Sequence, residues 1–237
     1  MGYKIGSARI DERGHASGGV AGDQKQKTTP DYKGEVSIQD FYIHSKGWYI
    51  LRPKDPAIGH SMAQAMVRAC NNPNIGYDQG QRLGIIKYGT LSKVKTECDC
   101  SSLVRQCVIE ASGKDPGNFT TMNETQALIG TRMFDRLSYD TGTVLKLGDV
   151  LVTKSKGHTA IVVEVEKAYP TLRKGSTGPW VHEAQTLLNY SCCLQADIQM
   201  DGDFGTETEK AVKTFQKKRC LKVDGIIGPK TWEALKK

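Results

Sequence analysis

Long apolar stretches are missing from this sequence. No apolar run in the 237 residues approaches the ~18 that a membrane-spanning helix needs. The first residues, MGYKIGSARIDERG, also lack the basic segment followed by an apolar stretch that marks a signal peptide. With 38% hydrophobic and 25% charged residues, the composition is typical of a soluble folded protein. We therefore expect a protein that is made in the cytoplasm, does not insert into a membrane and leaves the cell, if at all, by another route.

A basic face of the kind that binds nucleic acid is also missing. The net charge is +7, but residues 1–166 contribute only +3 and residues 178–237 only +1. The other +3 lies in residues 167–177, and no cluster of Arg and Lys alternates with aromatic residues. The charge argues against nucleic acid as a partner and fits weak attraction to an anionic polymer.

The cysteines are not spaced for disulfides or for a typical zinc site. There are seven, an odd number, and without a signal peptide we expect them to be mostly reduced. Cys98 and Cys100 are too close for the usual zinc-knuckle spacing, and no CxxC motif is present. A zinc site built from these two with Cys107 and His158 is a weaker alternative. The important question is whether one thiol is reactive.

Two similar turns dominate the C-terminal residues. Residues 201–205 and 224–228 both contain Asp-Gly followed by Phe or Ile and a second Gly, and each leads into a helical apolar pattern. Thr206, with Glu209 three residues later, predicts a capping box, and Thr231 predicts a cap for the last helix. With an amphipathic segment from residue 180, this predicts a small bundle of three helices.

Residues 180–237 resemble the peptidoglycan-binding domain found at the ends of many bacterial and phage cell-wall hydrolases. The resemblance rests on the paired turns, on Ala211-Val212 before Phe215-Gln216, and on the closing Gly-Pro-x-Thr-Trp. It implies peptidoglycan as the partner. Residues 167–179 contain two prolines and two glycines, which is typical of an interdomain linker. Catalysis is therefore expected in residues 1–166, of which 1–58 form an N-terminal extension.

Cys100 stands at the predicted start of a helix. After Ser101, apolar residues follow helical spacing at Leu103, Val104, Cys107 and beyond. The unpaired N–H groups and the positive dipole end of a first turn favour a thiolate at Cys100. Cys107 falls on the apolar face and is interpreted as a core residue, whereas Cys98 is a neighbour, a redox partner or without a role.

A base for this thiol is expected at His158. Residues 147–152 and 158–163 read as strands joined by a turn, so His158 opens the second strand, where its side chain can project toward a helix N-terminus. The other histidines, at positions 15, 44, 60 and 182, have weaker sequence contexts.

Three segments in this order resemble the NlpC/P60 cysteine peptidases and the related CHAP amidases and peptidases: residues 99–104, 148–151 and 157–162. The resemblance covers about residues 60–165. It implies a papain-like α+β fold in which a helix that starts at the cysteine packs on an antiparallel sheet. It also implies that Cys100 is the nucleophile, that His158 is the general base, and that neither a metal nor an organic cofactor is needed.

The same families use a third polar residue to orient the histidine and an aromatic residue near the oxyanion. Glu164 shares the His158 strand face but lies about 20 Å away at ~3.3 Å per residue. Glu35, which opens a predicted strand over 35–43 with a hairpin partner at 47–52, is our first candidate, and Asp23 in the glycine-rich segment 18–24 is the second. For the aromatic position the resemblance favours Tyr77 over Tyr88.

Together these resemblances predict a peptidoglycan hydrolase that cuts an amide bond of the stem peptide through a Cys/His acyl-enzyme, and the resemblance to NlpC/P60 peptidases implies a bond next to D-glutamate. A CHAP-like N-acetylmuramoyl-L-alanine amidase or cross-bridge peptidase is an alternative, and a non-catalytic wall-binding protein is another. The arrangement resembles a phage endolysin, which implies release from the host cytoplasm through a holin-type pore and a Gram-positive host. The sequence does not determine the oligomeric state, and a monomer is the expectation.

Overall fold

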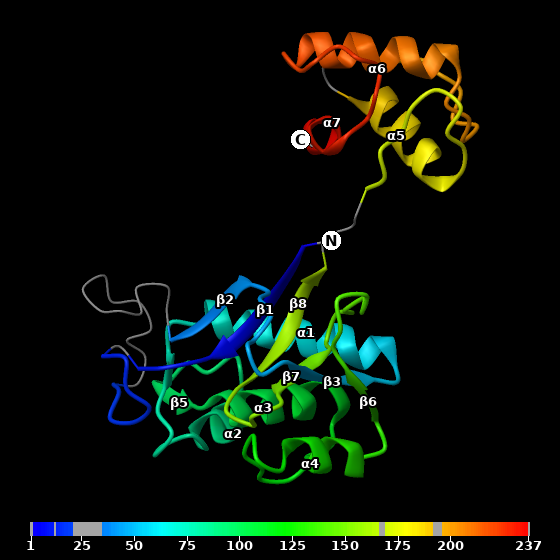
Figure 1. Cartoon of the computed structure of the whole chain (residues 1–237). Helices are drawn as coiled ribbons and strands as arrows, with labels where there is room; N and C mark the ends of the chain where they lie inside the picture. Colours follow the sequence, from blue (N-terminus) through cyan, green and yellow to red (C-terminus); the bar gives the residue numbers. More distant parts are fainter. Residues whose placement is uncertain (1, 12, 21–34, 166–168, 192–195, 237) are drawn as a thin grey trace. The chain divides into compact units, whose positions relative to one another are not determined.

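The computed structural model describes residues 2–11, 13–20, 35–165, 169–191 and 196–236. They form two compact units, Met1–Glu166 and Lys167–Lys237 (Figure 1). No helix in the described ranges has the length and hydrophobicity that a bilayer crossing requires.

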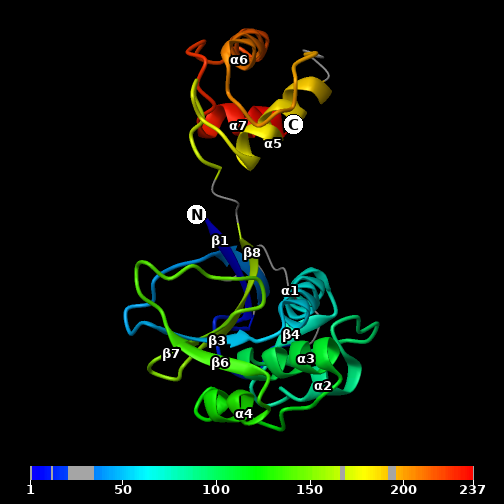
Figure 2. The same ribbon diagram turned by 90° about the vertical axis from the view of Figure 1, so that its right-hand side faces the viewer.

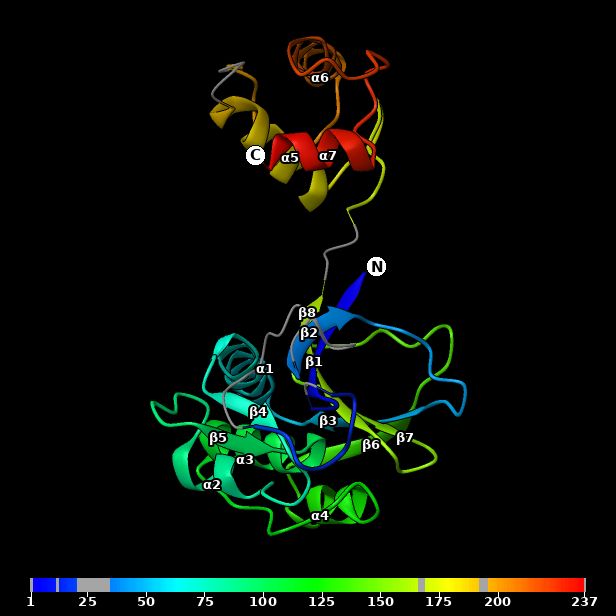
Figure 3. The same cartoon turned by 90° about the vertical axis from the view of Figure 1, so that its left-hand side faces the viewer.

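The first unit is built on a six-stranded antiparallel sheet with the strand order β2-β1-β8-β7-β3-β6. Two short parallel strands, β4 and β5, form a second sheet beside α2 and α3 (Figure 3). The strands are β1 (Tyr3–Ala8), β2 (Val36–Asp40), β3 (Trp48–Pro53), β4 (Ile75–Tyr77), β5 (Thr96–Cys98), β6 (Phe134–Ser138), β7 (Val150–Thr153) and β8 (Thr159–Val165).

The strand pairing confirms one predicted hairpin and corrects another. β7 and β8 pair antiparallel around the 154–157 turn, as the sequence predicts. The predicted hairpin between 35–43 and 47–52 is wrong, because β2 pairs with β1 whereas β3 pairs with β6 and β7. The physical reason is that β1, which the local pattern did not reveal, occupies the position beside β2.

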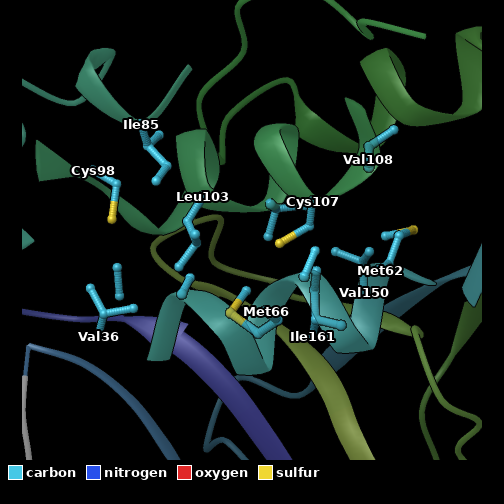
Figure 4. Close-up of a cluster of buried hydrophobic side chains, with 14 of the residues drawn as sticks. Val36, Met62, Met66, Ile85, Cys98, Leu103, Cys107, Val108, Val150 and Ile161 are labelled. Carbon is cyan, nitrogen blue, oxygen red and sulfur yellow. The ribbon is translucent and has the colours of Figure 1, made fainter. Parts of the chain in front are cut away.

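Four helices belong to this unit: α1 (Pro56–Asn71), α2 (Gly84–Tyr88), α3 (Cys100–Ser112) and α4 (Glu124–Gly130). Helices α1 and α3 pack together on the sheet, with Met66, Leu103, Cys107 and Ile161 meeting in one apolar cluster (Figure 4). Cys107 is completely buried in this cluster, which confirms its interpretation as a core residue.

The sheet has two differently covered faces (Figure 2). Along β8, Ile161 contributes to the cluster with the helices, and Thr159 bonds to α4. Ala160 and Val162 contribute to a second cluster with Trp48 on the opposite face. Successive strand residues point to opposite faces, so a shift of one residue at the start of β8 decides which face a side chain reaches.

The second unit contains three helices, as the sequence predicts: α5 (Pro179–Tyr190), α6 (Thr206–Lys218) and α7 (Pro229–Leu235). The predicted caps are wrong, because the N-cap residues are Gly205 and Gly228 and neither makes a side-chain cap. Thr231 is instead buried inside α7, where its hydroxyl accepts a hydrogen bond from Gln216.

The predicted linker over 167–179 also needs correction. Its residues 169–178 belong to the packed part of the second unit. Leu172 is buried and pairs with Ile227, and the Trp232 indole N–H donates to the Pro170 carbonyl at 2.8 Å. The prolines and glycines here shape an extended segment that the three-helix core holds in place.

Candidate active site

Helix α3 begins at Cys100, as the apolar spacing predicts. The preceding residue, Asp99, accepts a hydrogen bond from the Ser102 N–H at 2.6 Å, and the Asp99 N–H donates to the Ser102 hydroxyl at 2.9 Å. This reciprocal capping box pairs two backbone N–H groups at the helix start. Cys100 therefore lies in the first turn, at the positive end of the helix dipole.

The Cys100 thiol is buried, with 8% of the residue exposed. Burial, followed by the charges of Asp99 and Glu124, raises the pKa of Cys100 to about 12, although the nearby backbone amides of Thr159 and Ser101 lower it. The thiol is therefore protonated at neutral pH. The contact from Thr159 also shows that the start of β8 lies directly against the sulfur.

Tyr77 lies close to the Cys100 thiol. It ends β4 beside Cys98 of β5, and the negative charge of a Cys100 thiolate acts on its phenol. Burial raises the pKa of Tyr77, so its hydroxyl keeps its proton, and Gln79 donates to the hydroxyl oxygen at 3.1 Å. The phenol is thus a hydrogen-bond donor close to the thiol.

The imidazole of His158 is not hydrogen-bonded to Cys100. Its ring lies against Trp48, with 6.4 Å between the ring centroids, and only the backbone of His158 forms hydrogen bonds with described residues. Burial, followed by the positive charges of Arg9 and His44, lowers the pKa of His158 to about 4. The structure therefore brings the His158–Thr159 backbone to the thiol and leaves the ring neutral and beside Trp48.

The candidates for orienting His158 lie elsewhere. Glu35 is buried at the start of β2, and its carboxylate accepts a 2.6 Å hydrogen bond from the Tyr77 N–H. Glu164 pairs with Lys4 at the exposed end of β8. Asp23 lies outside the described residues. Glu35 thus supports Tyr77, and no carboxylate in the described ranges hydrogen-bonds the His158 ring.

The glycine-rich N-terminal segment does fold against the loop after Tyr77. The Gln79 N–H donates to the Ala16 carbonyl at 3.0 Å, and the Gly18 N–H donates to the Asp78 carboxylate at 3.1 Å. Ala16 and Gly18 therefore lie against the loop that follows Tyr77. Its remaining residues, 21–24, are outside the described ranges.

Two polar residues near Cys100 were missed by sequence reasoning. Arg82 forms an ion pair with Asp99 at 2.7 Å and donates to the Asn118 side chain and the Phe119 carbonyl. Glu124 is completely buried, and the Thr159 hydroxyl donates to it at 2.8 Å. Neither residue belongs to a sequence motif or to a periodic apolar pattern, and their hydrogen-bond partners are 17 to 37 residues away in sequence.

The alternative zinc set is not assembled in the described part of the chain. Cys98 is buried under β4, where its thiol donates to the Gly76 carbonyl at 3.5 Å, and Cys107 is in the apolar core. No group of three or more His, Cys, Asp or Glu side chains among the described residues is arranged to hold a metal ion.

Fold and site together define a class of two-unit protein, in which a mixed α/β unit with a cysteine in the first turn of a central helix is joined to a three-helix unit. The first unit matches the description of an endolysin-like domain over residues 5–169, which is most of the chain, and the chain belongs to that family. Residues 177–235 match a putative peptidoglycan binding domain.

Individual relatives match only part of the chain. A probable N-acetylmuramoyl-L-alanine amidase of Bacillus licheniformis is 42% identical over 64 residues, covering 27% of this chain and 18% of the relative. A zinc D-Ala-D-Ala carboxypeptidase of Streptomyces albus G is 37% identical over 65 residues, covering 27% and 26%. The solved SleB N-terminal domain is 35% identical, covers 29% of this chain and 90% of its own, and has a TM-score of 0.27.

The chain spans about a fifth to a quarter of the length of these two curated relatives. The matched stretches are comparable in length with the 177–235 match and much shorter than the 5–169 match.

Proposed function

We propose that the protein hydrolyses an amide bond in the peptide part of peptidoglycan, with Cys100 as the nucleophile and the second unit as the part that holds the wall. The observation that carries this proposal is the thiol in the first turn of α3, contacted by the Thr159 N–H and faced by Tyr77. The order of these elements supports a papain-like arrangement of the NlpC/P60 type.

In this mechanism His158 is the base. Its imidazole is neutral at pH 7 because its pKa is about 4, so it can accept a proton. Its ring lies on the Trp48 face of the sheet, whereas Thr159, the next residue, lies beside Cys100, so the mechanism requires the backbone at 157–158 to turn the ring from Trp48 toward Cys100. Pairing the two groups would lower the pKa of the thiol and raise that of the imidazole, because each charged form stabilises the other.

The reaction then follows the chemistry of cysteine acyl transfer. The thiol proton passes to the imidazole, the sulfur attacks the scissile carbonyl carbon, and the imidazolium gives its proton to the leaving amine. The Cys100 N–H at the helix start and the Tyr77 hydroxyl are the donors for the oxyanion. Water then hydrolyses the thioester and releases Cys100.

We place the cleaved bond next to D-glutamate, from the resemblance to NlpC/P60 peptidases. A second candidate is the N-acetylmuramoyl-L-alanine amide, and the observation that favours it is the amidase name of the Bacillus licheniformis relative. Because that match is about as long as the second unit, it supports the wall as the partner more strongly than it supports a particular bond.

The test is the loss of turbidity of purified cell walls, followed by mass spectrometry of the released fragments. Cys100→Ala and His158→Gln should each lower the rate at least about 100-fold while still sedimenting with walls. Cys220→Ser, which removes an exposed thiol from the second unit, should leave the rate unchanged. An active Cys100→Ala would overturn the mechanism, and the new amine and carboxyl ends identify the bond.

A further inference from the structure

We propose that Glu124 is a positioning residue of the Cys100 site: through Thr159 it holds the amide that contacts the thiol, and it must be neutral for Cys100 to ionise. The inference rests on the proposed role of Cys100 as the nucleophile. It deepens that proposal by adding a regulating group from α4, an element outside the three segments, 99–104, 148–151 and 157–162, on which Cys100 and His158 were predicted.

The contacts of Thr159 carry the first half of the argument. Its backbone amide lowers the pKa of the Cys100 thiol, which places it close to the sulfur, and its hydroxyl donates to Glu124 Oε1 at 2.8 Å. Thr159 therefore lies between the carboxyl group, to which it is hydrogen-bonded, and the thiol. Thr159 is also the residue after His158, so the same bond fixes the backbone from which the proposed base projects.

The second half comes from the burial of Glu124. The residue is completely buried, and its other oxygen, Oε2, has no hydrogen-bond partner in the part of the chain that the structure describes. Burying an ionised carboxylate in this way is costly, whereas the protonated group is tolerated. Burial accordingly raises the pKa of Glu124 to about 8, so the group is mostly neutral at pH 7.

The charges around Glu124 determine what its ionisation does. From α3, Asp99 and Cys100 face it, and Asp99 is itself paired with Arg82. From β8 the contact is the uncharged Thr159. No described cation bonds to Glu124, so its negative charge acts directly against a thiolate at Cys100. A neutral Glu124 removes this repulsion, and its proton on Oε2 remains available as a hydrogen-bond donor.

The experiment measures the alkylation rate of Cys100 by iodoacetamide between pH 6 and 10, in the full chain, by mass spectrometry of the Cys100 peptide. In the wild type the rate should flatten above about pH 8, as Glu124 ionises. In Glu124→Gln, which keeps the acceptor for Thr159 and stays neutral, it should continue to rise and exceed the wild-type rate about 10-fold at pH 9.5. The exposed Cys220 in the same digest is the internal control.

A second variant keeps the test decisive if Glu124→Gln folds poorly. Thr159→Val removes the hydroxyl that favours ionised Glu124, so the flattening should move to higher pH. Identical profiles for Cys100 in the wild type and in a folded variant of either kind would overturn the inference. A Cys100→Ala variant that still degrades cell walls would instead contradict the proposed function. In that case the alkylation profiles would still report whether the ionisation of Glu124 affects Cys100.

Discussion

Asp99 uses its two carboxylate oxygens for different purposes. Oδ1 accepts the Ser102 N–H and starts α3, whereas Oδ2 receives the Arg82 guanidinium. Arg82 in turn reaches the loop at Asn118 and Phe119. The position of Cys100 in the first turn therefore depends on both a helix cap and a half-buried ion pair.

Replacing Asp99 should separate these two contributions. Asp99→Ala removes the cap, which costs about 1–2 kcal/mol of unfolding free energy, and also leaves the partly buried Arg82 without its partner. Asp99→Asn keeps an oxygen that accepts the Ser102 N–H, so it should lose clearly less unfolding free energy than Asp99→Ala. Urea denaturation measures both. Asp115→Ala breaks the exposed ion pair with Arg105 beyond the other end of α3 and should cost less than about 1 kcal/mol.

Equal losses for Asp99→Ala and Asp99→Asn would show that the cap contributes nothing. A loss for Asp115→Ala as large as that for Asp99→Ala would show that the burial of the Arg82 pair is unimportant. Both outcomes would contradict the account of how Cys100 is positioned.

At the scale of elements, one close approach fixes α1 against the turn before β7. A Cβ on Gly148 would lie 2.2 Å from the carbonyl oxygen of Gly59 in α1, and the φ of Gly148 is +80°. Gly148→Ala should therefore lower the unfolding free energy by about 2–5 kcal/mol, from backbone strain and from overpacking together. Thermal or urea unfolding of the first unit measures the loss.

Gly117→Ala is the matched control for this change. Its φ is +89°, yet nothing lies within 4 Å of an added Cβ, so only the backbone cost of about 1–2 kcal/mol applies. If the two variants lost the same unfolding free energy, the contact with Gly59 would contribute nothing to the loss in Gly148→Ala.

The second unit repeats one hydrogen-bond network in both of its turns. Gln185 donates to Asp201 and accepts the Gly202 N–H, and Gln216 does the same with Asp224 and Gly225. Each amide also donates to a threonine of the following helix, Thr208 or Thr231. The buried glutamine, rather than the predicted threonine caps, therefore fixes each turn.

Gln216→Ala should thus lower the stability of the second unit by about 2–4 kcal/mol, because it leaves buried donors and acceptors unpaired. We expect a lower unfolding temperature for this unit and weaker sedimentation with cell walls. The unfolding temperature of the first unit should not change. Gln199→Ala, at an exposed position of the same unit, should change neither property, and a similar effect at both sites would contradict the role of the network.

The sequence predicts those features that local patterns encode. Cys100 at a helix start, Cys107 in the core, the β7–β8 hairpin and the three C-terminal helices all follow from spacing along the chain. The partners of β2 and β3 do not, because they lie far apart in sequence. Glu124 could not be found for the same reason, since its partner Thr159 is 35 residues away and only folding brings them together.

At the scale of the whole molecule, Glu124 and His158 of the first unit should shape the pH dependence of stability in opposite directions. Burial raises the pKa of Glu124 from 4.5 to about 8 and lowers that of His158 from 6.5 to about 4. The stability that depends on neutral Glu124 is complete below pH 4.5 and is lost as the pH rises to 8. The stability that depends on neutral His158 is complete above pH 6.5 and is lost as the pH falls to 4.

These two slopes oppose each other between pH 4.5 and 6.5, and of the two groups Glu124 is the one that contributes a slope between pH 6.5 and 8. In that upper window the unfolding free energy of the first unit should fall by about 1.4 kcal/mol per pH unit, because the unfolded state has already lost the proton that the folded state keeps. Glu124→Gln should remove this slope. The second unit is an internal reference, because its shifted groups, Asp201, Glu209 and Asp224, all have a lowered pKa and titrate only in acid. Urea unfolding at pH 6.5, 7.25 and 8 measures the slope, and a slope unchanged in Glu124→Gln would mean that another group carries the proton.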